Sequence, residues 1–233
     1  MSQKVNPIGF RVGVSQNWNT QMQCYQKTSL TYTLTVLKKL QIFSFFQRLL
    51  FKHNIILSKA EWLLKDGSIY CDLFYTKYEP LTRQPLLEIS KKILKVLKYW
   101  ITSPFVFRFY KIHWFSNPTT VSHWICYQLE KKQNIKWILL LLKKKKINYQ
   151  KWNTEIKYDI SGENAFLLKG IKIICSGRLR GRRNRMSSKT WKQVGVMPLQ
   201  RLHGFVEYKK DNAYTRFGKI GVHVYYYYAK HLN

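Results

Sequence analysis

Hydrophobic and polar positions along the chain of 233 residues follow the spacing of helices in three long stretches. Apolar residues recur every three or four positions from Tyr32 to His53, which predicts an α-helix. A second stretch with this spacing follows Pro85, and a third helix is predicted from about Thr120 to Leu142, directly before four lysines. These stretches predict the helical part of the fold.

Shorter stretches have the composition and spacing of β-strands. IILSKAEWLL and IYCDLFY flank the turn sequence KDGS and predict a hairpin, and FVFRFYKIHW is rich in β-forming residues. LQRLHGFVEY and KIGVHVYYYY predict two more strands. Period-two spacing in the last one puts four side chains on one face, namely Val222, Val224, Tyr226 and Tyr228. In AFLLKGIKIICSGRLRG we expect the end of a helix, a stop at Gly170 and then a strand.

The mixed order of these elements predicts an α+β fold in two lobes that meet near residue 118. Residues 1–20 are polar and are expected to form an arm. The first lobe then comprises residues 21–118 and the second residues 119–233. Residues 147–163 carry no pattern and are predicted to form an inserted loop in the second lobe.

Positive charge dominates the composition. The chain has 41 Lys and Arg against 11 Asp and Glu, a formal net charge of +30, and 45% hydrophobic residues, enough to build a core. A compact protein with this charge repels itself unless a polyanion neutralises it, which leaves nucleic acid or an anionic membrane. The longest apolar run, WILLLL, is far shorter than the roughly 18 to 20 residues of a span, so we expect no membrane span.

The sequence contains no recognisable catalytic or metal-binding motif. The four cysteines form no CxxC pair and are expected to be reduced and mostly buried. The six histidines form no HExxH motif, and neither a GxxxxGK[ST] loop nor a serine elbow occurs. We therefore expect no enzyme, no metal site and no cofactor.

The stretch SGRLRGRRNR at residues 176–185 holds five arginines and two glycines and no acid. The guanidinium group presents a planar fork of donors that fits phosphate oxygens, and glycine lets the backbone approach a phosphate closely. We expect RNA contact here rather than a merely solvated loop. The predicted contacts are Arg178, Arg180, Arg182, Arg183 and Arg185, followed by Lys189 and Lys192.

Lysines also flank the apolar segment WILLLL of the third predicted helix. They either line a nucleic-acid strand or solvate the ends of the helix, and the sequence leaves both interpretations open. These lysines are Lys131, Lys132, Lys136, Lys143, Lys144, Lys145 and Lys146. The run YYYY near the C-terminus is interpreted as a strand with two tyrosines in the core and two outside, because aromatic residues are enriched in strands.

Five stretches, in order, resemble the family of small-subunit ribosomal protein three, the universal S-three family. MSQKVNPIGFRVG is similar to the family's opening GQKVNPxGFRLG, and YQLEKK resembles SQLERR of its middle helix. GIKIICSGRLRG, VMPLQRL and YTRFGKIGVHVYYY are similar to three blocks of its C-terminal part. These stretches cover both ends and the middle of the chain.

The resemblance implies a type II KH-like first lobe and a second lobe with an α/β two-layer fold. It also implies a place in the head of the small ribosomal subunit where messenger RNA enters. The implied partners are small-subunit ribosomal RNA, messenger RNA and ribosomal proteins ten and fourteen. Four positions match RNA-contacting residues of the family: Lys4, Asn6, Arg11 and Arg178. The family's messenger-facing cations fall on Lys136, Trp137 and Leu140, of which the first keeps its charge.

Departures from the family pattern refine these expectations. The place of the KH domain's GxxG loop is occupied by YEPLTRQP, which has no glycine, so the lobe is expected to be degenerate. The family's GAExAR becomes RGRRNR, which adds phosphate-binding groups.

The expected compartment is the mitochondrion. Residues with AU-rich codons abound, and the opening is neither a signal peptide nor a transit sequence, so we expect a mitochondrial ribosome, with a plastid ribosome as the alternative. The alternative function is an organellar RNA chaperone or splicing factor, which would share the charge but bind many transcripts.

Overall fold

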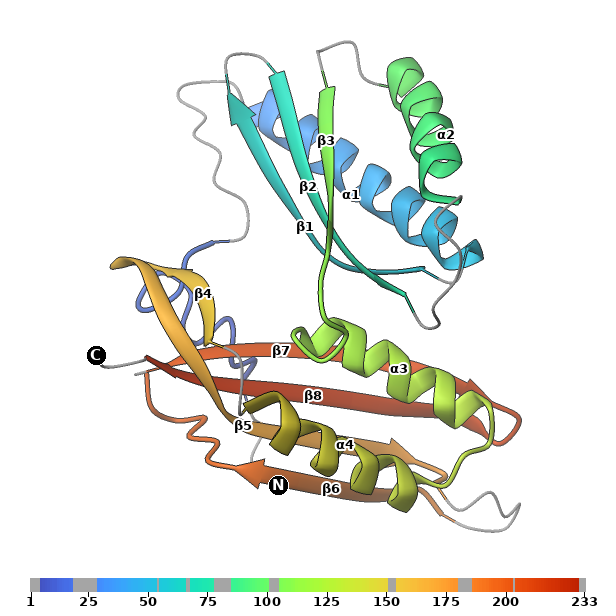
Figure 1. The fold of residues 1–233 in the computed structure, drawn as a ribbon, viewed down its shortest axis with the longest axis vertical. Helices are drawn as coiled ribbons and strands as arrows, with labels where there is room; N and C mark the ends of the chain where they lie inside the picture. Colours follow the sequence, from blue (N-terminus) through green and yellow to red (C-terminus); the bar gives the residue numbers. More distant parts are fainter. Residues whose placement is uncertain are drawn as a thin grey trace. The chain divides into compact units, whose positions relative to one another are not determined.

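The fold is mixed α+β with two separate β-sheets (Figure 1). The computed structural model describes residues 5–18, 29–53, 55–65, 68–77, 85–100, 105–150, 154–179, 186–202 and 204–230. The chain divides into two compact units. The smaller unit comprises residues 19–114, and the larger unit joins residues 1–18 to residues 115–233. The N-terminal arm is therefore part of the larger unit.

The smaller unit packs two helices against a three-stranded sheet with the strand order β1-β2-β3. Its elements are α1 (Ser29–Lys52), β1 (Ile55–Lys65), β2 (Ser68–Lys77), α2 (Pro85–Trp100) and β3 (Phe105–Lys111). The predicted hairpin is confirmed, because β1 and β2 pair antiparallel. β2 and β3 pair parallel, as expected of strands joined through a helix such as α2.

The core of the smaller unit lies between the two helices and the sheet. α2 buries Ile89, Ile93 and Leu97, as its spacing predicts. The predicted first helix is also confirmed as α1, but its buried positions are Ile42, Phe46 and Leu50. Leu37 and Leu40 lie at the same helical spacing within the predicted helix, but they are 51% and 63% exposed. α1 is apolar on several sides, so periodicity predicts the helix more reliably than it predicts the buried face.

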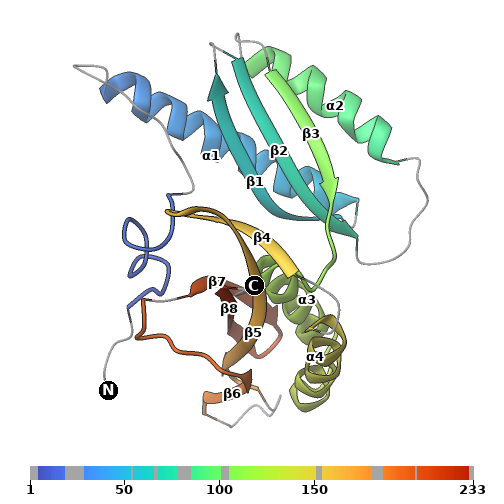
Figure 2. The same ribbon diagram turned by 60° about the vertical axis from the view of Figure 1, so that its left-hand side comes forward.

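The larger unit packs two helices against one face of a five-stranded sheet (Figures 1 and 2). The strands are ordered β4-β5-β8-β7, and β6 pairs with the second half of β5. The elements are α3 (Pro118–Glu130), α4 (Ile135–Gln150), β4 (Thr154–Asp159), β5 (Gly162–Gly177), β6 (Ser188–Gly195), β7 (Phe205–Thr215) and β8 (Gly218–Lys230).

The strand β8 confirms the period-two prediction. Val222, Val224, Tyr226 and Tyr228 are all fully buried on the side of the helices. The hydroxyl of Tyr226 donates to the carbonyl oxygen of Phe115 at 3.1 Å, and that of Tyr228 donates to Ser116 at 3.0 Å. Each buried phenol therefore ties the sheet to the segment that leads into α3, which satisfies a polar group that burial would otherwise leave without a partner.

The single helix expected from Thr120 to Leu142 is two helices. Lys132 has a positive φ of 63°, and the N–H groups of Lys131 and Gln133 donate to carbonyl groups of the last turn of α3. Asn134 then accepts a hydrogen bond from the N–H of Lys136 at 3.1 Å and caps α4. In KKQN, the left-handed Lys132 thus ends α3 and Asn134 caps the start of α4, although lysine is a good helix former.

Two further predictions for the second half of the chain are wrong. The segment predicted as an unpatterned loop at 147–163 contains the end of α4, the strand β4 and the start of β5. Gly170 does not end a helix, because it lies inside β5, where the register with β8 shifts. A Cβ atom at this position would lie 1.7 Å from the carbonyl oxygen of Val196. Gly170 is thus a site of close backbone approach rather than a helix stop.

Candidate nucleic-acid interface

Arg178 directly follows β5, and its side chain is exposed. The strand that precedes it is held on both sides, by β8 and by β6. The backbone at the start of the arginine-rich stretch is therefore fixed by a packed sheet. The other predicted arginines, Arg180, Arg182, Arg183 and Arg185, lie outside the described residues, as does Lys4.

The two lysines predicted beyond the arginines face opposite sides of the sheet. Lys189 pairs with Ser176 on the face that the helices leave open, and it is exposed. Lys192 pairs with Ile173 on the helix-covered face and lines a small pocket with Lys143 of α4. The structure therefore brings Lys192 together with the lysines of α4 and not with Lys189. The alternation of the strand separates them.

The predicted lysines around α3 and α4 lie on the surface of the larger unit. The exposed side chains are those of Lys131, Lys132, Lys136, Lys143, Lys144 and Lys145, whereas the side chain of Lys146 lies outside the described residues. α4 buries Ile135, Ile138 and Leu142 against the sheet, so its lysines project away from the core. Lys131 packs its ammonium group 4.3 Å from the centre of the Tyr127 ring.

Two apolar side chains share the exposed surface of α4. Trp137 and Leu140 are 49% and 50% exposed. They are two of the three positions at which the resemblance led us to expect messenger-facing residues. Lys136 keeps both the exposure and the charge. The surface of α4 is therefore basic at its ends and partly apolar in its middle.

Arg11 is fully buried, in contrast to its expected role as an RNA contact. Its Nη1 donates to the carbonyl oxygen of Pro7, and its Nη2 donates to those of Pro198, Leu199 and Arg201 at 3.2, 3.0 and 2.6 Å. Burial lowers the pKa of the guanidinium, although arginine stays charged at any working pH. With every donor nitrogen inside the protein, Arg11 cannot reach a phosphate in this arrangement, and we revise its role to that of a structural anchor.

The rest of the arm is also bound to the larger unit. Gln16 is buried, and its amide donates to the carbonyl oxygen of Val206 at 3.1 Å. Asn6 is exposed, but its side-chain oxygen accepts the N–H of Ile8 at 3.0 Å and shapes a local turn. The strand predicted at LQRLHGFVEY is confirmed only in its second part, FVEY. The structure begins β7 only at Phe205, and the described part of the preceding segment is irregular and held through its carbonyl groups by Arg11.

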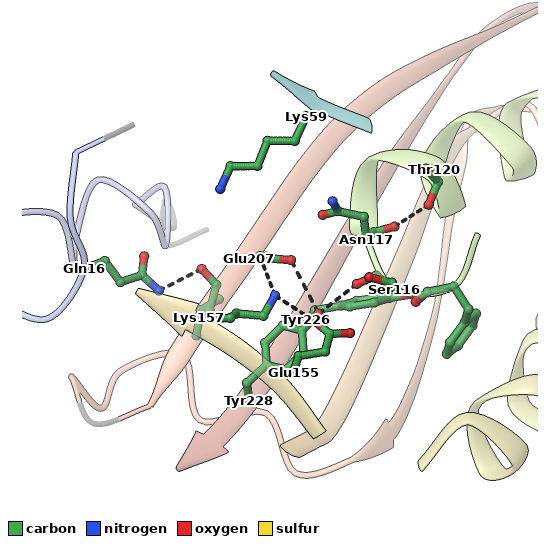
Figure 3. A network of polar contacts seen from close by, with 12 residues as sticks. Gln16, Lys59, Ser116, Asn117, Thr120, Glu155, Lys157, Glu207, Tyr226 and Tyr228 are labelled. Carbon is green, nitrogen blue, oxygen red and sulfur yellow. Dashed lines mark hydrogen bonds and ion pairs between the residues drawn. The ribbon is translucent and has the colours of Figure 1, made fainter. Parts of the chain in front are cut away.

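The acidic side chains of the larger unit are mostly used inside it. Lys157 of β4 lies 2.6 Å from Glu207 and 3.0 Å from Glu155, and its ammonium group is 3.8 Å from the centre of the Tyr228 ring (Figure 3). Its side chain is 11% exposed. Sequence reasoning missed this ion cluster because β4 falls in the segment predicted as a loop. Alternation in TEIKYD is the signal that could have revealed it.

Three more carboxylates have partners in the same unit. Asp211 accepts a hydrogen bond from Ser122 and lies 4.0 Å from the imidazole of His123. Asp159 pairs with Lys230 at 3.3 Å, and Glu130 accepts the N–H of Tyr214 at 3.0 Å. Among the described residues, no ion pair with a carboxylate involves Arg178, Lys189 or the lysines of α4. Their charges remain available to an external anion.

The thiols of the described cysteines are poorly reactive. Cys71, Cys126 and Cys175 are free and buried, which confirms the expectation for these three. Burial raises the pKa of each to about 12, so the nucleophilic thiolate is scarce at neutral pH. No group of three or more potential metal ligands occurs in the part of the chain that the structure describes. In the same part, no helix is long and apolar enough to cross a membrane.

Fold and surface together define a class of protein. A basic surface sits on a rigid α+β unit, the acidic groups are mostly engaged internally, and the described cysteines are unreactive. These features are typical of a structural protein that binds a nucleic acid mainly through its phosphates.

Comparison with known proteins identifies the family. Residues 144–225 match the family model of the ribosomal protein S3 C-terminal domain. The small ribosomal subunit protein uS3 of Trichlorobacter lovleyi is 31% identical over 233 residues, covering 96% of this chain and 95% of that protein. That of Lawsonia intracellularis is 28% identical over 97% of this chain and 95% of its own length. The mitochondrial protein uS3m of Chondrus crispus is 26% identical over 98% and 95%.

The chain belongs to the uS3 family of small ribosomal subunit proteins. Its role is structural, in translation, and it is not an enzyme.

Proposed function

We propose that this protein holds ribosomal RNA in the head of a mitochondrial small ribosomal subunit, close to where messenger RNA enters. The observation that carries the proposal is the exposed Arg178 at the end of a strand paired on both sides. It opens a stretch with four further arginines, within a unit whose carboxylates are mostly engaged elsewhere. Such a loop binds folded RNA by charge and shape, because phosphate contacts position a protein without reading base sequence.

The proposed ribosomal RNA contacts are Lys4, Asn6, Arg178, Arg180, Arg182, Arg183, Arg185, Lys189 and Lys192. Arg11 acts through the arm instead, because its guanidinium is buried. The lysines around α3 and α4 are proposed to contact messenger RNA. Their exposure supports this role, and the apolar Trp137 and Leu140 make the messenger contact weaker than the ribosomal one.

The smaller unit is proposed to be a degenerate type II KH-like lobe. The parallel pairing of β2 with β3, joined through α2, supports this assignment. The larger unit is then the α/β two-layer lobe that carries the RNA contacts. The segment that would carry the GxxG loop has no glycine, so the backbone there cannot approach a phosphate as a KH domain requires. We therefore assign nucleic-acid binding to the larger unit, and we infer ribosomal proteins ten and fourteen of the head as protein neighbours.

The mitochondrial assignment rests on two supports. One is the similarity to uS3m of Chondrus crispus over nearly the whole chain. The other is the abundance of residues with AU-rich codons, which is typical of organellar genomes.

The test combines crosslinking with a charge-matched comparison. Ultraviolet crosslinking in the native organelle, followed by sequencing of the attached RNA, should recover the head region of small-subunit ribosomal RNA, with messenger RNA crosslinked near residues 131–146. Changing Arg178, Arg180, Arg182 and Arg183 to Ala should release the protein from assembled subunits at moderate salt. The control removes the same number of charges from α2, by changing Lys91, Lys92, Lys95 and Lys98 to Ala.

The two sets of results separate the alternatives. If the arginine variant stays bound as firmly as the control, the arginine stretch does not hold the protein to ribosomal RNA. Crosslinks spread over introns and many transcripts, without enrichment of ribosomal RNA, would replace the ribosomal assignment by the chaperone.

A further inference from the structure

The sheet of the larger unit has one face that α3 and α4 do not cover. We call this the open face and define it by six residues on β6, β5, β7 and β8: Lys189, Trp191, Lys172, Tyr208, Tyr214 and Tyr225. The register places them opposite to the buried series Val222, Val224 and Tyr226 of β8. The alternation in YYYY predicts two tyrosines outside the core, but the sequence could not show which residues of β6 and β7 share their face, because that depends on strand pairing.

Aromatic rings on the open face are accessible. Trp191 is 62% exposed and Tyr214 is 70% exposed, whereas large apolar side chains of the opposite face, such as Tyr226, are fully buried. On the same face, Tyr208 and Tyr225 lie against each other with ring centres 4.7 Å apart. The exposed rings therefore sit on a rigid, pre-ordered surface and not on loops.

Cations accompany these exposed rings. The ammonium group of Lys172 lies 5.5 Å from the centre of the Trp191 ring, and that of Lys219 lies 5.8 Å from the centre of the Tyr214 ring. Lys189, two residues before Trp191, and Lys210 of β7 are exposed as well. Each exposed ring thus has a lysine ammonium group beside it. In this arrangement, a nucleotide can stack its base on the ring while its phosphate binds the lysine.

Carboxylates are segregated to the other side of the sheet. Glu207 and Asp211 of β7 pair with Tyr226 and Val222 and so share the helix-covered face. Glu163 points to the same side of the sheet as the open face. It lies in the hairpin of β4 and β5, at the end of β5 that is far from Lys172. A protein partner would have to supply acidic groups against this face, whereas an RNA strand supplies both the negative charge and the flat rings.

We propose that the open face is a stacking platform for unpaired nucleotides of RNA, with Trp191 and Tyr214 as the stacking residues and Lys172, Lys189 and Lys219 as their phosphate partners. The inference rests on the proposed RNA-binding function for the natural ligand, but it concerns residues other than those of the arginine stretch. Stacking tolerates any base, because every base has a flat face. The platform therefore complements phosphate contacts to helical RNA by holding a single-stranded segment.

The experiment measures binding of the full-length protein to two probes by fluorescence anisotropy over a range of salt concentrations. One probe is a 12-nucleotide oligouridine, and the other is a 12-base-pair RNA duplex. Trp191→Ala should weaken binding to the oligouridine about tenfold, the order expected for one lost stacked base, and should leave the duplex unaffected. Trp191→Phe should restore most of the affinity. Tyr158→Ala, which removes a ring that is 61% exposed on β4, is the matched control and should change neither affinity.

Salt dependence distinguishes stacking from charge. Trp191→Ala should leave the salt slope unchanged, because a lost stacking contact releases no counterion. Lys189→Ala should reduce the slope by about 0.7, the value for one phosphate contact to a single strand.

Three outcomes would overturn the platform. The first is an unchanged oligouridine affinity in both Trp191→Ala and Tyr214→Ala. The second is an equal loss of affinity for the duplex. The third is unchanged RNA binding together with failure of Trp191→Ala to enter ribosomal subunits, which would assign the open face to a protein neighbour. If the arginine variant no longer binds RNA while Trp191→Ala and Tyr214→Ala still bind it with wild-type affinity, the stacking platform is refuted and the proposed function is retained.

Discussion

Arg11 shows how one buried cation organises the N-terminal arm. Its guanidinium binds the carbonyl groups of Pro198, Leu199 and Arg201, which end no helix and pair in no described strand. A buried charge is tolerated only when such partners replace the lost water. The segment before β7 and the arm thus hold each other in place.

Arg11→Met should lower the free energy of unfolding by about 2 to 4 kcal/mol, because it leaves one buried and three partly buried carbonyl groups without their donor. Arg178→Met, at an exposed site, should change it by less than about 0.5 kcal/mol but should reduce the salt dependence of RNA binding. Urea unfolding, followed by fluorescence, measures the first effect, and anisotropy measures the second. Equal stability of the two variants would show that Arg11 does not anchor the arm.

At the scale of the element, the strand β5 contains a position, Gly170, at which only glycine fits. β5 pairs with β4 along its first half, with β6 along its second half, and with β8 along most of its length. The register with β8 shifts between Leu168 and Gly170, where the chain passes Val196 too closely for a side chain. The strand can change neighbours here because glycine leaves room.

Gly170→Ala should therefore destabilise the protein by about 3 kcal/mol or more, since the added methyl group collides with backbone that cannot move aside. Gly9→Ala is the control, because the nearest atom to its added Cβ would be the Asn6 carbonyl oxygen at 3.7 Å. That variant should stay within about 0.5 kcal/mol of the wild type. Comparable unfolding midpoints for the two variants would mean that β5 and the Val196 segment separate easily.

For the whole molecule, partly buried histidines couple stability to pH. His123 of α3 faces Asp211 and Lys209 of β7. Burial lowers the pKa of its imidazole below the usual 6.5; Lys209 adds to this effect and Asp211 opposes it. Burial, together with Lys210 and Lys189, also lowers the pKa of His223. The unfolded chain then binds more protons than the folded one as the pH falls below about 6.5, so stability is present above that pH and is lost on acidification.

The urea midpoint should accordingly fall between pH 7.5 and pH 5.5. His123→Gln should flatten this dependence, because the unfolded state no longer gains that proton, and adding His223→Gln should flatten it further. A wild-type midpoint that stays constant or rises on acidification to pH 5.5 would contradict the lowered pKa values of these partly buried imidazoles.

The sequence by itself determined the features that depend on short-range pattern and on composition. Alternation in GVHVYYYY predicts the buried face of β8, because a strand turns successive side chains to opposite sides whatever it packs against. The spacing of Ile89, Ile93 and Leu97 does the same for α2. The excess of cations predicts a polyanionic partner, and the five motif blocks indicate the uS3 family, which the comparisons establish.

Only the tertiary structure decided where the polar groups go. Arg11 meets its carbonyl partners 187 to 190 positions away, and Lys157 meets Glu207 50 positions away, so no local pattern could predict either burial. The sequence likewise shows the charged and aromatic residues of β6 and β7, but it does not predict which of them share a face of the sheet. That depends on strand pairing and register. Hydrophobic periodicity reports local burial, whereas ion pairs and open surfaces are properties of how distant strands come together.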